Sequence, residues 1–298
     1  MTASVIALPG AEACAARLAA QLCAPCCALE SRRFPDGERY LRVLDPVAGR
    51  DMLVVAQLRG PDPQLPGLLF LADALRELGA AHVRLVAPYL PYMRQDTRFQ
   101  PGEAVTSRTL AKWIDSNFDA LVTVDPHLHR NSTLDVLFRL PTSVVSSAPD
   151  IAAWLRANVS QPHVIGPDEE SRQWVAEVAA HAGCEFSVLK KVRRGDREVE
   201  VSMLEAHLLQ GCTPVLIDDI VSTAHTMADV VRHLLAAGLA APVCIAVHAL
   251  FAEGADTLLL QCGARQVVSC NTLPHVSNAI DVSGALAEGI RALPDFHA

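Results

Sequence analysis

The sequence predicts an α/β fold with mainly parallel sheets, arranged as two similar domains. Three observations lead to this prediction. The chain has 298 residues, of which 51% are hydrophobic, and this is enough for two domains with substantial cores. Short apolar or β-branched runs alternate with segments of helical periodicity, as in folds whose helices pack on parallel strands. Segments 52–86 and 214–247 also share one order of strand, loop, helix and strand.

Each predicted strand is a short buried run, and each predicted helix is amphipathic. The strands are expected at residues 5–8, 52–56, 83–87, 121–124, 163–165, 186–189, 199–201, 214–217, 243–249 and 266–269. The helices are expected at residues 11–22, 65–78, 106–117, 151–158, 171–182, 226–237 and 254–261. The helices of the two similar segments both contain the pattern A-D-x-x-R, at residues 72–76 and 228–232. We therefore expect a duplicated domain.

Charge and hydropathy exclude several classes of protein. The chain has 25 Lys and Arg against 33 Asp and Glu, a net charge of −8, which is not typical of a generic nucleic-acid binder. The apolar stretch 234–247 contains Gly238 and Pro242 and is shorter than the ~20 residues that cross a bilayer. Residues 1–10 show no basic leader, and nine cysteines suit a reducing compartment. We expect a cytoplasmic protein without nucleic-acid or membrane partners.

One cysteine cluster has two interpretations. Cys23, Cys26 and Cys27 form a C-x-x-C-C pattern that could bind zinc or act in redox chemistry. No second C-x-x-C and no neighbouring histidine completes a tetrahedral set of ligands. The simpler interpretation is that these small apolar side chains pack at the end of the first helix. The role of the cysteine cluster stays open.

The strongest chemical signal is residues 215–226, VLIDDIVSTAHT, an apolar strand that leads into two carboxylates and then a helix. Ligands of open α/β sheets bind at the carboxyl ends of strands, and a helix N-terminus offers N–H groups to phosphate. Asp218 and Asp219 can accept hydrogen bonds from sugar hydroxyls, while the Ser and Thr hydroxyls after them can bind phosphate. A sugar phosphate would satisfy both parts. The alternative is that Asp219 or Ser222 only caps the helix.

This run resembles the phosphoribosyl diphosphate-binding loop of type I phosphoribosyltransferases and ribose-phosphate pyrophosphokinases. Further motifs follow the order found in the pyrophosphokinases: RFPDGE at 33–38, PYMRQD at 91–96 with PGE at 101–103, TVDPH at 123–127 and GPD at 166–168. The resemblance covers about residues 34–226. It implies two type I phosphoribosyltransferase-like domains, each a mainly parallel sheet flanked by helices, at residues 1–145 and 146–280. It leaves open whether a C-terminal helix, 281–298, joins the first domain.

The resemblance also implies an activity and a set of site residues. The family transfers the terminal diphosphoryl group of ATP to O1 of ribose 5-phosphate and releases AMP, with Mg²⁺ as cofactor, as a homo-oligomer and in nucleotide biosynthesis. The residues implied for ATP are Phe34, Asp36, Glu38, Arg94, Gln95 and Asp96. Those implied for ribose 5-phosphate are Asp218, Asp219, Ser222, Thr223, Ala224, His225 and Thr226. The implied contacts of ATP-bound Mg²⁺ or its waters are His127 and Asp168, and the implied catalytic cations on a mobile flap are Lys191 and Arg193.

The motifs implied for ATP also have interpretations that do not depend on the resemblance. An extended segment would place Phe34, Asp36 and Glu38 on one face, where an aromatic plane flanked by acceptors suits adenine. A turn at Asp36-Gly37 would instead make the segment a surface loop. Arg94 follows a proline-rich strand end and can bind phosphate, but an exposed Arg–Asp pair is equally common.

The implied metal and flap residues allow two readings in the same way. On their own, His127 and His129 would suggest zinc, because magnesium prefers oxygen ligands. The cationic run 190–197 lies between two β-prone stretches and predicts a hairpin with its turn at Gly195-Asp196. Cations at a hairpin tip usually do no more than protect a solvated edge.

Several positions depart from the family pattern and indicate a divergent branch. His225 stands where the sugar-phosphate loop usually has glycine, whose missing side chain permits a close backbone approach. Ser222 replaces a frequent Asp, and EES at 169–171 replaces small residues. Two other functions therefore stay open. A phosphoribosyltransferase would explain the Asp-Asp loop but not the ATP-type motifs. A non-catalytic regulatory homologue fits His225 but not the retention of Lys191 and Arg193.

Overall fold

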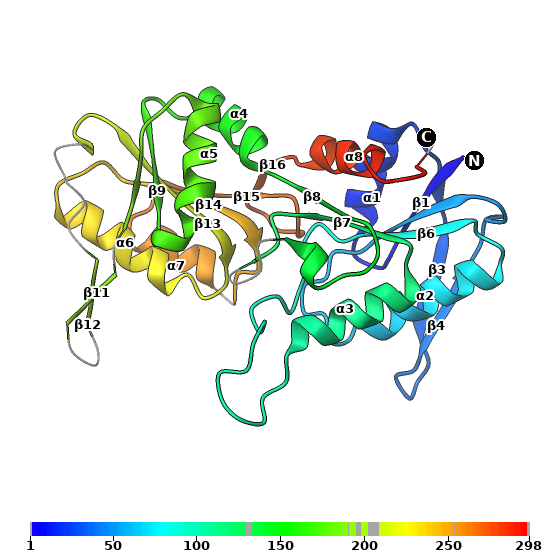
Figure 1. The fold of residues 1–298 in the computed structure, drawn as a ribbon. Helices are drawn as coiled ribbons and strands as arrows, with labels where there is room; N and C mark the ends of the chain where they lie inside the picture. Colours follow the sequence, from blue (N-terminus) through cyan, green and yellow to red (C-terminus); the bar gives the residue numbers. More distant parts are fainter. Residues whose placement is uncertain are drawn as a thin grey trace. The chain divides into compact units, whose positions relative to one another are not determined.

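The structure, a computed structural model, describes residues 2–128, 133–189, 191–194, 198–201, 209–252 and 254–296. The chain forms two compact units (Figure 1). The first consists of Met1–Ser146, Thr272–Pro274 and Val282–Ala298, and the second of Ser147–Asn271 and His275–Asp281. Among the described residues, no helix combines the length and the apolar character that crossing a membrane requires.

The first unit is built on a six-stranded sheet in the order β2-β1-β5-β6-β7-β8, and its neighbouring strands pair in parallel. The strands are β1 (Ala3–Ala7), β2 (Cys26–Cys27), β5 (Asp51–Val55), β6 (His82–Val86), β7 (Ala120–Val124) and β8 (Thr142–Val145). The helices are α1 (Glu12–Leu22), α2 (Leu65–Glu77), α3 (Thr106–Asn117), α8 (Ser283–Arg291) and the short 3-10 helix η1 (Leu134–Val136). In Figure 1, α1 and α8 lie on one side of the sheet and α2 and α3 on the other. Strands β5 and β7 are therefore buried along their whole length.

The second unit repeats this plan with a six-stranded parallel sheet in the order β10-β9-β13-β14-β15-β16. The strands are β9 (Pro162–Gly166), β10 (Phe186–Val188), β13 (Thr213–Val221), β14 (Val243–Ala249), β15 (Gln266–Cys270) and β16 (Asn278–Ile280). The helices are α4 (Ala148–Asn158), α5 (Arg172–Ala182), α6 (His225–Ala236), α7 (Ala255–Gln261) and the 3-10 helix η2 (Glu169–Ser171). Helices α4 and α5 pack against each other, as do α6 and α7 (Figure 1).

Both units also carry an antiparallel hairpin at the same point in the chain order, between the second and third strands of the sheet. In the first unit the hairpin consists of β3 (Leu29–Arg33) and β4 (Arg39–Val43). In the second it consists of β11 (Lys191–Arg194) and β12 (Glu198–Val201). The shared strand order and the shared hairpin agree with the predicted duplication, and the predicted α/β class is confirmed.

The predicted elements match the structure where the local pattern is strong, and the exceptions are short or polar. Helix α3 has the predicted limits, and the predicted strands differ from the observed ones mostly by one or two residues. The strands β2, β3, β4, β8, β11 and β16 were not predicted. β2 and β16 have two and three residues, and β3 and β4 are rich in arginine, so none of these four gives a buried apolar run.

A buried ion pair anchors the C-terminal residues to the first unit. Arg84 on β6 is 3% exposed and Asp51 on β5 is 1% exposed. Arg84 Nε donates to Asp51 Oδ1 at 2.9 Å, while its terminal nitrogens donate to the carbonyls of Pro294 at 3.0 Å and Asp295 at 3.3 Å. The guanidinium also lies 5.8 Å from the ring centroid of Phe296. Because every side of this buried cation has a partner, its burial is compensated.

Candidate functional site

The carboxylates of Asp218 and Asp219 lie within a strand, β13, rather than in a loop after it. The sequence predicted a strand at residues 214–217, but β13 continues to Val221. Its extra residues pair with the end of β14, Ile220 with His248 and Val221 with Ala249. The backbone of the Asp218 and Asp219 pair is thus held rigidly by the sheet. The prediction of the strand end was wrong because the partner strand, which decides the length, is not visible locally.

The electrostatics of this pair are unusual. The pKa of Asp218 is raised to about 8, mainly because the carboxyl is buried and then because the negative charges of Asp219 and Asp168 face it. Asp168 follows β9, the neighbour of β13 in the sheet, and its Oδ1 accepts a hydrogen bond from the Ser171 N–H at 3.3 Å. The structure therefore brings together three carboxylates from two motifs that are distant in sequence. Such a site favours a ligand that offers hydroxyl donors or positive charge.

Helix α6 begins at His225, a short distance along the chain from these carboxylates, and presents its N-terminus. Ala224 precedes the helix in the left-handed region, with φ of 59°, and its carbonyl accepts the first helical bond from the Ala228 N–H at 2.8 Å. Thr223, His225 and Thr226 are exposed. The first N–H groups of a helix have no intrahelical partner, so they are available to an anion. His225 is already helical, so the backbone there does not require glycine. The unusual conformation is at Ala224.

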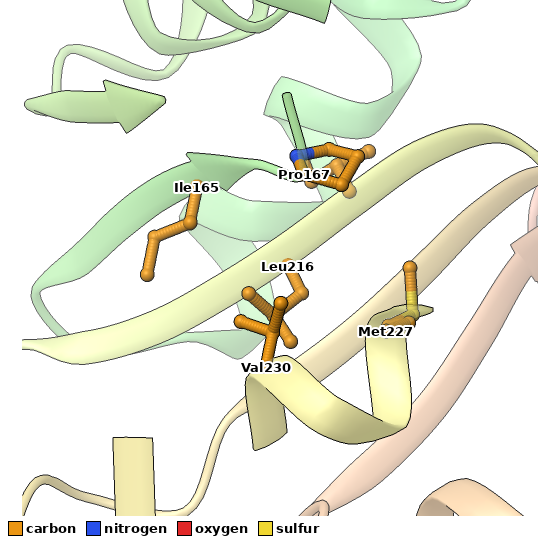
Figure 2. A pocket seen from close by; sticks show the side chains of 6 residues that line it. Ile165, Pro167, Leu216, Met227 and Val230 are labelled. Atoms are coloured by element: carbon orange, nitrogen blue, oxygen red, sulfur yellow. The ribbon is translucent and has the colours of Figure 1, made fainter. Parts of the chain in front are cut away.

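An apolar cluster beneath the carboxylates holds the three elements together. Figure 2 shows these side chains, which come from the β9 end, from β13 and from α6. They are Ile165, Pro167, Leu216, Ile217, Met227 and Val230. The space among them is too small for a water molecule, so it is packing and not a ligand site. This packing fixes the start of α6 beside the strand that carries Asp218 and the strand end that leads to Asp168.

The residues at 34–38 form the turn of the hairpin β3–β4. The Phe34 N–H donates to the Glu38 carbonyl at 2.8 Å, and the Gly37 N–H donates to the Phe34 carbonyl at 2.9 Å. Gly37 has φ of 95°, which favours glycine, and the Glu38 N–H donates to Asp36 Oδ1 at 3.2 Å. The segment is thus a turn and not an extended strand. Phe34 is 40% exposed at its start.

The loop that contains Arg94, Gln95 and Asp96 is tied to the start of α3. The Ser107 hydroxyl donates to the Gln95 carbonyl at 3.2 Å, and the Thr106 hydroxyl donates to the Tyr92 carbonyl at 3.3 Å. Arg94 is exposed, whereas Asp96 is 8% exposed. The two side chains thus do not form the exposed ion pair that the sequence left open. Arg94 points a cation into solvent from a fixed backbone.

Tyr92 opens the same loop in the left-handed region, with φ of 64°. Its hydroxyl donates to Asp62 Oδ1. Burial and this carboxylate raise the pKa of Tyr92 to about 12. The phenol therefore stays protonated and keeps its hydrogen bond across the physiological range, which gives the loop a second attachment.

The remaining predicted residues are placed less completely. His127 is half-buried after β7, where Asp125 has φ of 33° and its N–H donates to the Val145 carbonyl at 3.1 Å. His129 lies outside the described residues. Lys191 and Arg193 lie on β11, which pairs with β12, so a hairpin is present as predicted. Its first arm is Lys191–Arg194 and not the β-prone stretch 186–189, which contains β10 of the sheet, and the two cations therefore lie in an arm of the hairpin. The side chains of Lys191 and Arg193 and the predicted turn at 195–196 lie outside the described part of the chain.

The cysteine cluster does not form a metal site in the described residues. Cys23 ends α1 in the left-handed region with φ of 52°, while Cys26 and Cys27 form β2. Burial raises the pKa of the Cys27 thiol, so it is poorly reactive as a ligand. Among the residues that the structure describes, no group of three or more His, Cys, Asp or Glu side chains is arranged to hold a metal ion by itself.

Two residues beside the predicted set were missed by the sequence analysis. Arg32 and Tyr40 contact the Phe34 ring from the strands of the hairpin. The signal that could have found them is the spacing of two residues between Arg32 and Phe34, which puts both on one face of a strand. The sequence did not indicate this spacing as significant, because β3 and β4 have no continuous apolar run that predicts a strand.

Comparison with known proteins identifies the family. Residues 3–117 match the model of the N-terminal domain of ribose phosphate pyrophosphokinase, and residues 144–284 match the phosphoribosyl transferase domain. A ribose-phosphate pyrophosphokinase from Methanopyrus kandleri is 37% identical over 279 residues, covering 93% of this chain and 94% of the relative. One from Methanothermobacter thermautotrophicus is 33% identical, covering 95% and 98%.

A solved structure gives the same fold. The phosphoribosylpyrophosphate synthetase from Mycobacterium smegmatis superposes with a TM-score of 0.83 over 98% of both chains, at 24% sequence identity. The match covers both units, and the curated relatives cover both as well. The chain belongs to the ribose-phosphate pyrophosphokinase family.

Proposed function

We propose that this protein is a ribose-phosphate diphosphokinase, which transfers the diphosphoryl group of ATP to O1 of ribose 5-phosphate and yields 5-phosphoribosyl 1-diphosphate and AMP. The observation that carries the proposal is the arrangement at the end of β13, where two carboxylates in a rigid strand lead to an open helix N-terminus. Relatives that bear the name of this activity align over nearly the whole chain, which supports it further.

Ribose 5-phosphate is proposed to bind in the second domain, residues 146–280. Asp218 and Asp219 would accept hydrogen bonds from the ribose hydroxyls. The 5-phosphate would lie at the N-terminus of α6, where exposed N–H groups and the positive end of the helix dipole favour an anion. The residues assigned to the phosphate are Ser222, Thr223, Ala224, His225 and Thr226, through hydroxyl and backbone donors.

ATP is proposed to bind through the first domain, residues 1–145. Phe34 offers an exposed aromatic plane for the adenine, and Asp36 and Glu38 of the same turn offer acceptors. The other assigned residues are Arg94, Gln95 and Asp96, whose loop is fixed at α3. An exposed guanidinium on a fixed backbone suits a phosphate oxygen.

Mg²⁺ is the cofactor that fits the donor chemistry. The mutual repulsion of Asp168, Asp218 and Asp219 is what a divalent cation would relieve, and carboxylate oxygens are the ligands that Mg²⁺ prefers. Asp168 and His127 are the residues we assign to it, with His127 acting through bound water. The remaining ligands would be water and substrate oxygens, as is usual for this ion. When bound, Mg²⁺ neutralises charge on the polyphosphate.

The chain's own residues then have defined roles in the transfer. The bond from O1 of the sugar to the β-phosphorus forms as the bond from that phosphorus to the oxygen of the α-phosphate breaks. The O1 hydroxyl gives up its proton to solvent, and AMP leaves with the oxygen of the broken bond. Such a transfer needs alignment, neutralised charge and exclusion of water more than covalent help from protein. Lys191 and Arg193, on the hairpin β11–β12, are proposed to stabilise the negative charge that develops on the transferred group.

We further propose a homo-oligomer located in the cytoplasm, which binds ATP and ribose 5-phosphate but neither nucleic acid nor membrane. The net charge of −8 supports the exclusion of nucleic acid. The homo-oligomeric state and the cytoplasmic location are proposed because the resemblance to the family implies them.

The direct test is to incubate the purified protein with ATP, Mg²⁺ and ribose 5-phosphate and to follow the products by ³¹P NMR. We expect AMP and a sugar diphosphate in equal amounts. If no AMP forms under varied metal and phosphate concentrations, the proposal is wrong and a regulatory homologue is favoured. If a nucleobase consumes added 5-phosphoribosyl 1-diphosphate while ATP is not cleaved, the protein is a phosphoribosyltransferase instead.

The flap assignment has its own test. The double variant Lys191→Ala, Arg193→Ala should lower kcat by about a hundredfold or more, because the cations act on the transition state. The KM for ATP should change little. The control Arg265→Ala removes an exposed cation from the same domain and should leave kcat unchanged. A double variant with normal kcat would contradict the assignment.

A further inference from the structure

The hairpin β3–β4 has two faces of different character. Leu29, Leu41 and Val43 point one way and pack against the core of the first unit. Side chains alternate along a strand, so the residues between them form the opposite face. That outer face carries Glu30, Arg32, Tyr40 and Arg42, and Phe34 continues it into the turn. Packing of the fold does not need this outer face.

The outer face holds an ordered cluster around Phe34. Arg32 and Tyr40 are direct cross-strand partners. The guanidinium carbon of Arg32 lies 4.2 Å from the Tyr40 ring centroid and 4.7 Å from the Phe34 centroid. The two rings meet edge to face, with centroids 6.0 Å apart and planes at 87°. These are the distances of favourable cation–π and aromatic contacts.

The contacts fix an aromatic side chain at the tip of an exposed hairpin. Arg32 also approaches Glu30, with Nε 3.9 Å from Oε1, so the cation is held from a second side. Phe34 is nevertheless 40% exposed, so much of its ring is open to a ligand. A ring that is held before a ligand arrives loses less freedom on binding, and the affinity is correspondingly higher.

The backbone of the hairpin is held as well. Arg39 donates from Nη2 to the Pro63 carbonyl at 3.0 Å, and its side chain lies directly over Gly67 of α2. A Cβ built at Gly67 would stand 2.7 Å from Arg39 Cδ. The absence of a side chain at Gly67 therefore lets Arg39 attach the start of β4 to α2, and the turn that carries Phe34 is positioned from its base.

We propose that Arg32 and Tyr40 are positioning residues that hold the Phe34 ring as a preformed platform for the purine base of the nucleotide. They determine the affinity for the nucleotide, and they leave the transfer step unaffected. This inference rests on the proposed function, in which Phe34 contacts the adenine. The ligand chemistry is a flat purine ring that stacks on an aromatic plane.

The test compares steady-state kinetics of Arg32→Met and Tyr40→Leu with those of the unaltered protein. We expect the KM for ATP to rise about fivefold to tenfold, where tenfold corresponds to about 1.4 kcal/mol, with kcat and the KM for ribose 5-phosphate unchanged. Arg32→Lys keeps the cation and should restore most of the affinity.

Arg42→Met is the matched control. Arg42 stands on the same face, and its Nη1 lies 4.0 Å from the same Glu30 carboxylate, without a ring contact among the described residues. It should bind ATP normally. Equilibrium binding of a non-hydrolysable ATP analogue should change in the same order as KM, and unaltered thermal midpoints will show that the variants are folded.

The variant Phe34→Ala distinguishes a failure of the proposed ATP site from a failure of the positioning role of Arg32 and Tyr40. If Phe34→Ala leaves the KM for ATP unchanged, the proposed ATP site is wrong, and this inference falls with it. If Phe34→Ala weakens ATP binding while Arg32→Met and Tyr40→Leu do not, the site stands and the positioning role is refuted. A loss of kcat at unchanged KM in the Arg32 variant would also refute it.

Discussion

Replacement of Asp218 by Asn is expected to stabilise the protein at neutral pH while it weakens sugar binding. Asp218 carries a pKa of about 8 against an ordinary 3.8, because burial and two neighbouring carboxylates oppose its ionisation. The folded protein thus keeps a proton that the unfolded chain has already lost. The contribution of this group to stability is fully present below about pH 4, and it is lost as the pH rises toward 8.

The size of the stability change follows from the difference between the pKa values of Asp218 in the folded and unfolded chain. Each pH unit between the two pKa values removes about 1.4 kcal/mol, so the loss at pH 7 is on the order of 4 kcal/mol. Asn has nearly the same shape and does not ionise, and its Oδ1 can still accept the Asp219 N–H, now 3.1 Å from Asp218 Oδ1. The variant therefore avoids this loss, and its thermal midpoint at pH 7 should rise by roughly 10 °C.

The assay is the thermal midpoint of both proteins, without ligand or metal, measured from about pH 4 to pH 9. The curves should coincide near pH 4, separate as the pH rises and run parallel above pH 8. The same variant should raise the KM for ribose 5-phosphate at least about tenfold, because an amide donor replaces one of the two carboxyl oxygens that are proposed to accept from the ribose hydroxyls. Asp229→Asn, at an exposed position of α6 paired with Arg232, is the control and should shift the midpoint little.

The outcome that would refute this reasoning is a difference between the proteins that is independent of pH. A constant difference would mean that the substitution acts through packing or hydrogen bonds and that Asp218 ionises normally in the fold. A variant less stable at pH 8 than at pH 4, relative to the unaltered protein, would reverse the predicted sign.

Two further predictions concern the first unit. A Gly→Ala substitution in a helix usually raises the free energy of unfolding by ~1 kcal/mol. Gly67→Ala should not give this gain, because the added Cβ would displace the Arg39 side chain. Gly284→Ala in α8 should give it, because the added Cβ there meets no other atom. Urea unfolding of the two variants compares these effects, and equal gains would contradict the contact. Arg84→Met should destabilise the protein by about 3–5 kcal/mol and expose the C-terminal residues to carboxypeptidase, because a buried carboxylate loses its partner. Arg76→Met, which breaks an exposed pair, should cost no more than about 1 kcal/mol, and similar losses in both variants would argue against a buried charge.

The sequence was informative where local pattern decides structure. Helix α3 and strand β14 have the predicted limits, because each combines a clear period with a clear boundary. The hairpin β3–β4 escaped prediction because its outer face is charged and aromatic, so its strands show no continuous apolar run. The end of β13 was misplaced since the pairing with β14 carries the strand through two carboxylates that, taken alone, look like a loop.

The sequence by itself determined the order of the motifs, the chemical type of each side chain and the repetition of one α/β unit, because these depend on local periodicity and composition. Only the tertiary structure decided which of these groups meet. Asp168 lies close enough to raise the pKa of Asp218 because β9 and β13 are neighbours in the sheet, although α5, β10 and the hairpin β11–β12 separate them in the chain. Arg32 reaches Phe34 and Tyr40 together because strand pairing places them on one face. Burial and proximity are properties of the folded chain. They decide whether the Asp218 carboxyl is charged and whether the exposed Phe34 ring is held in one position.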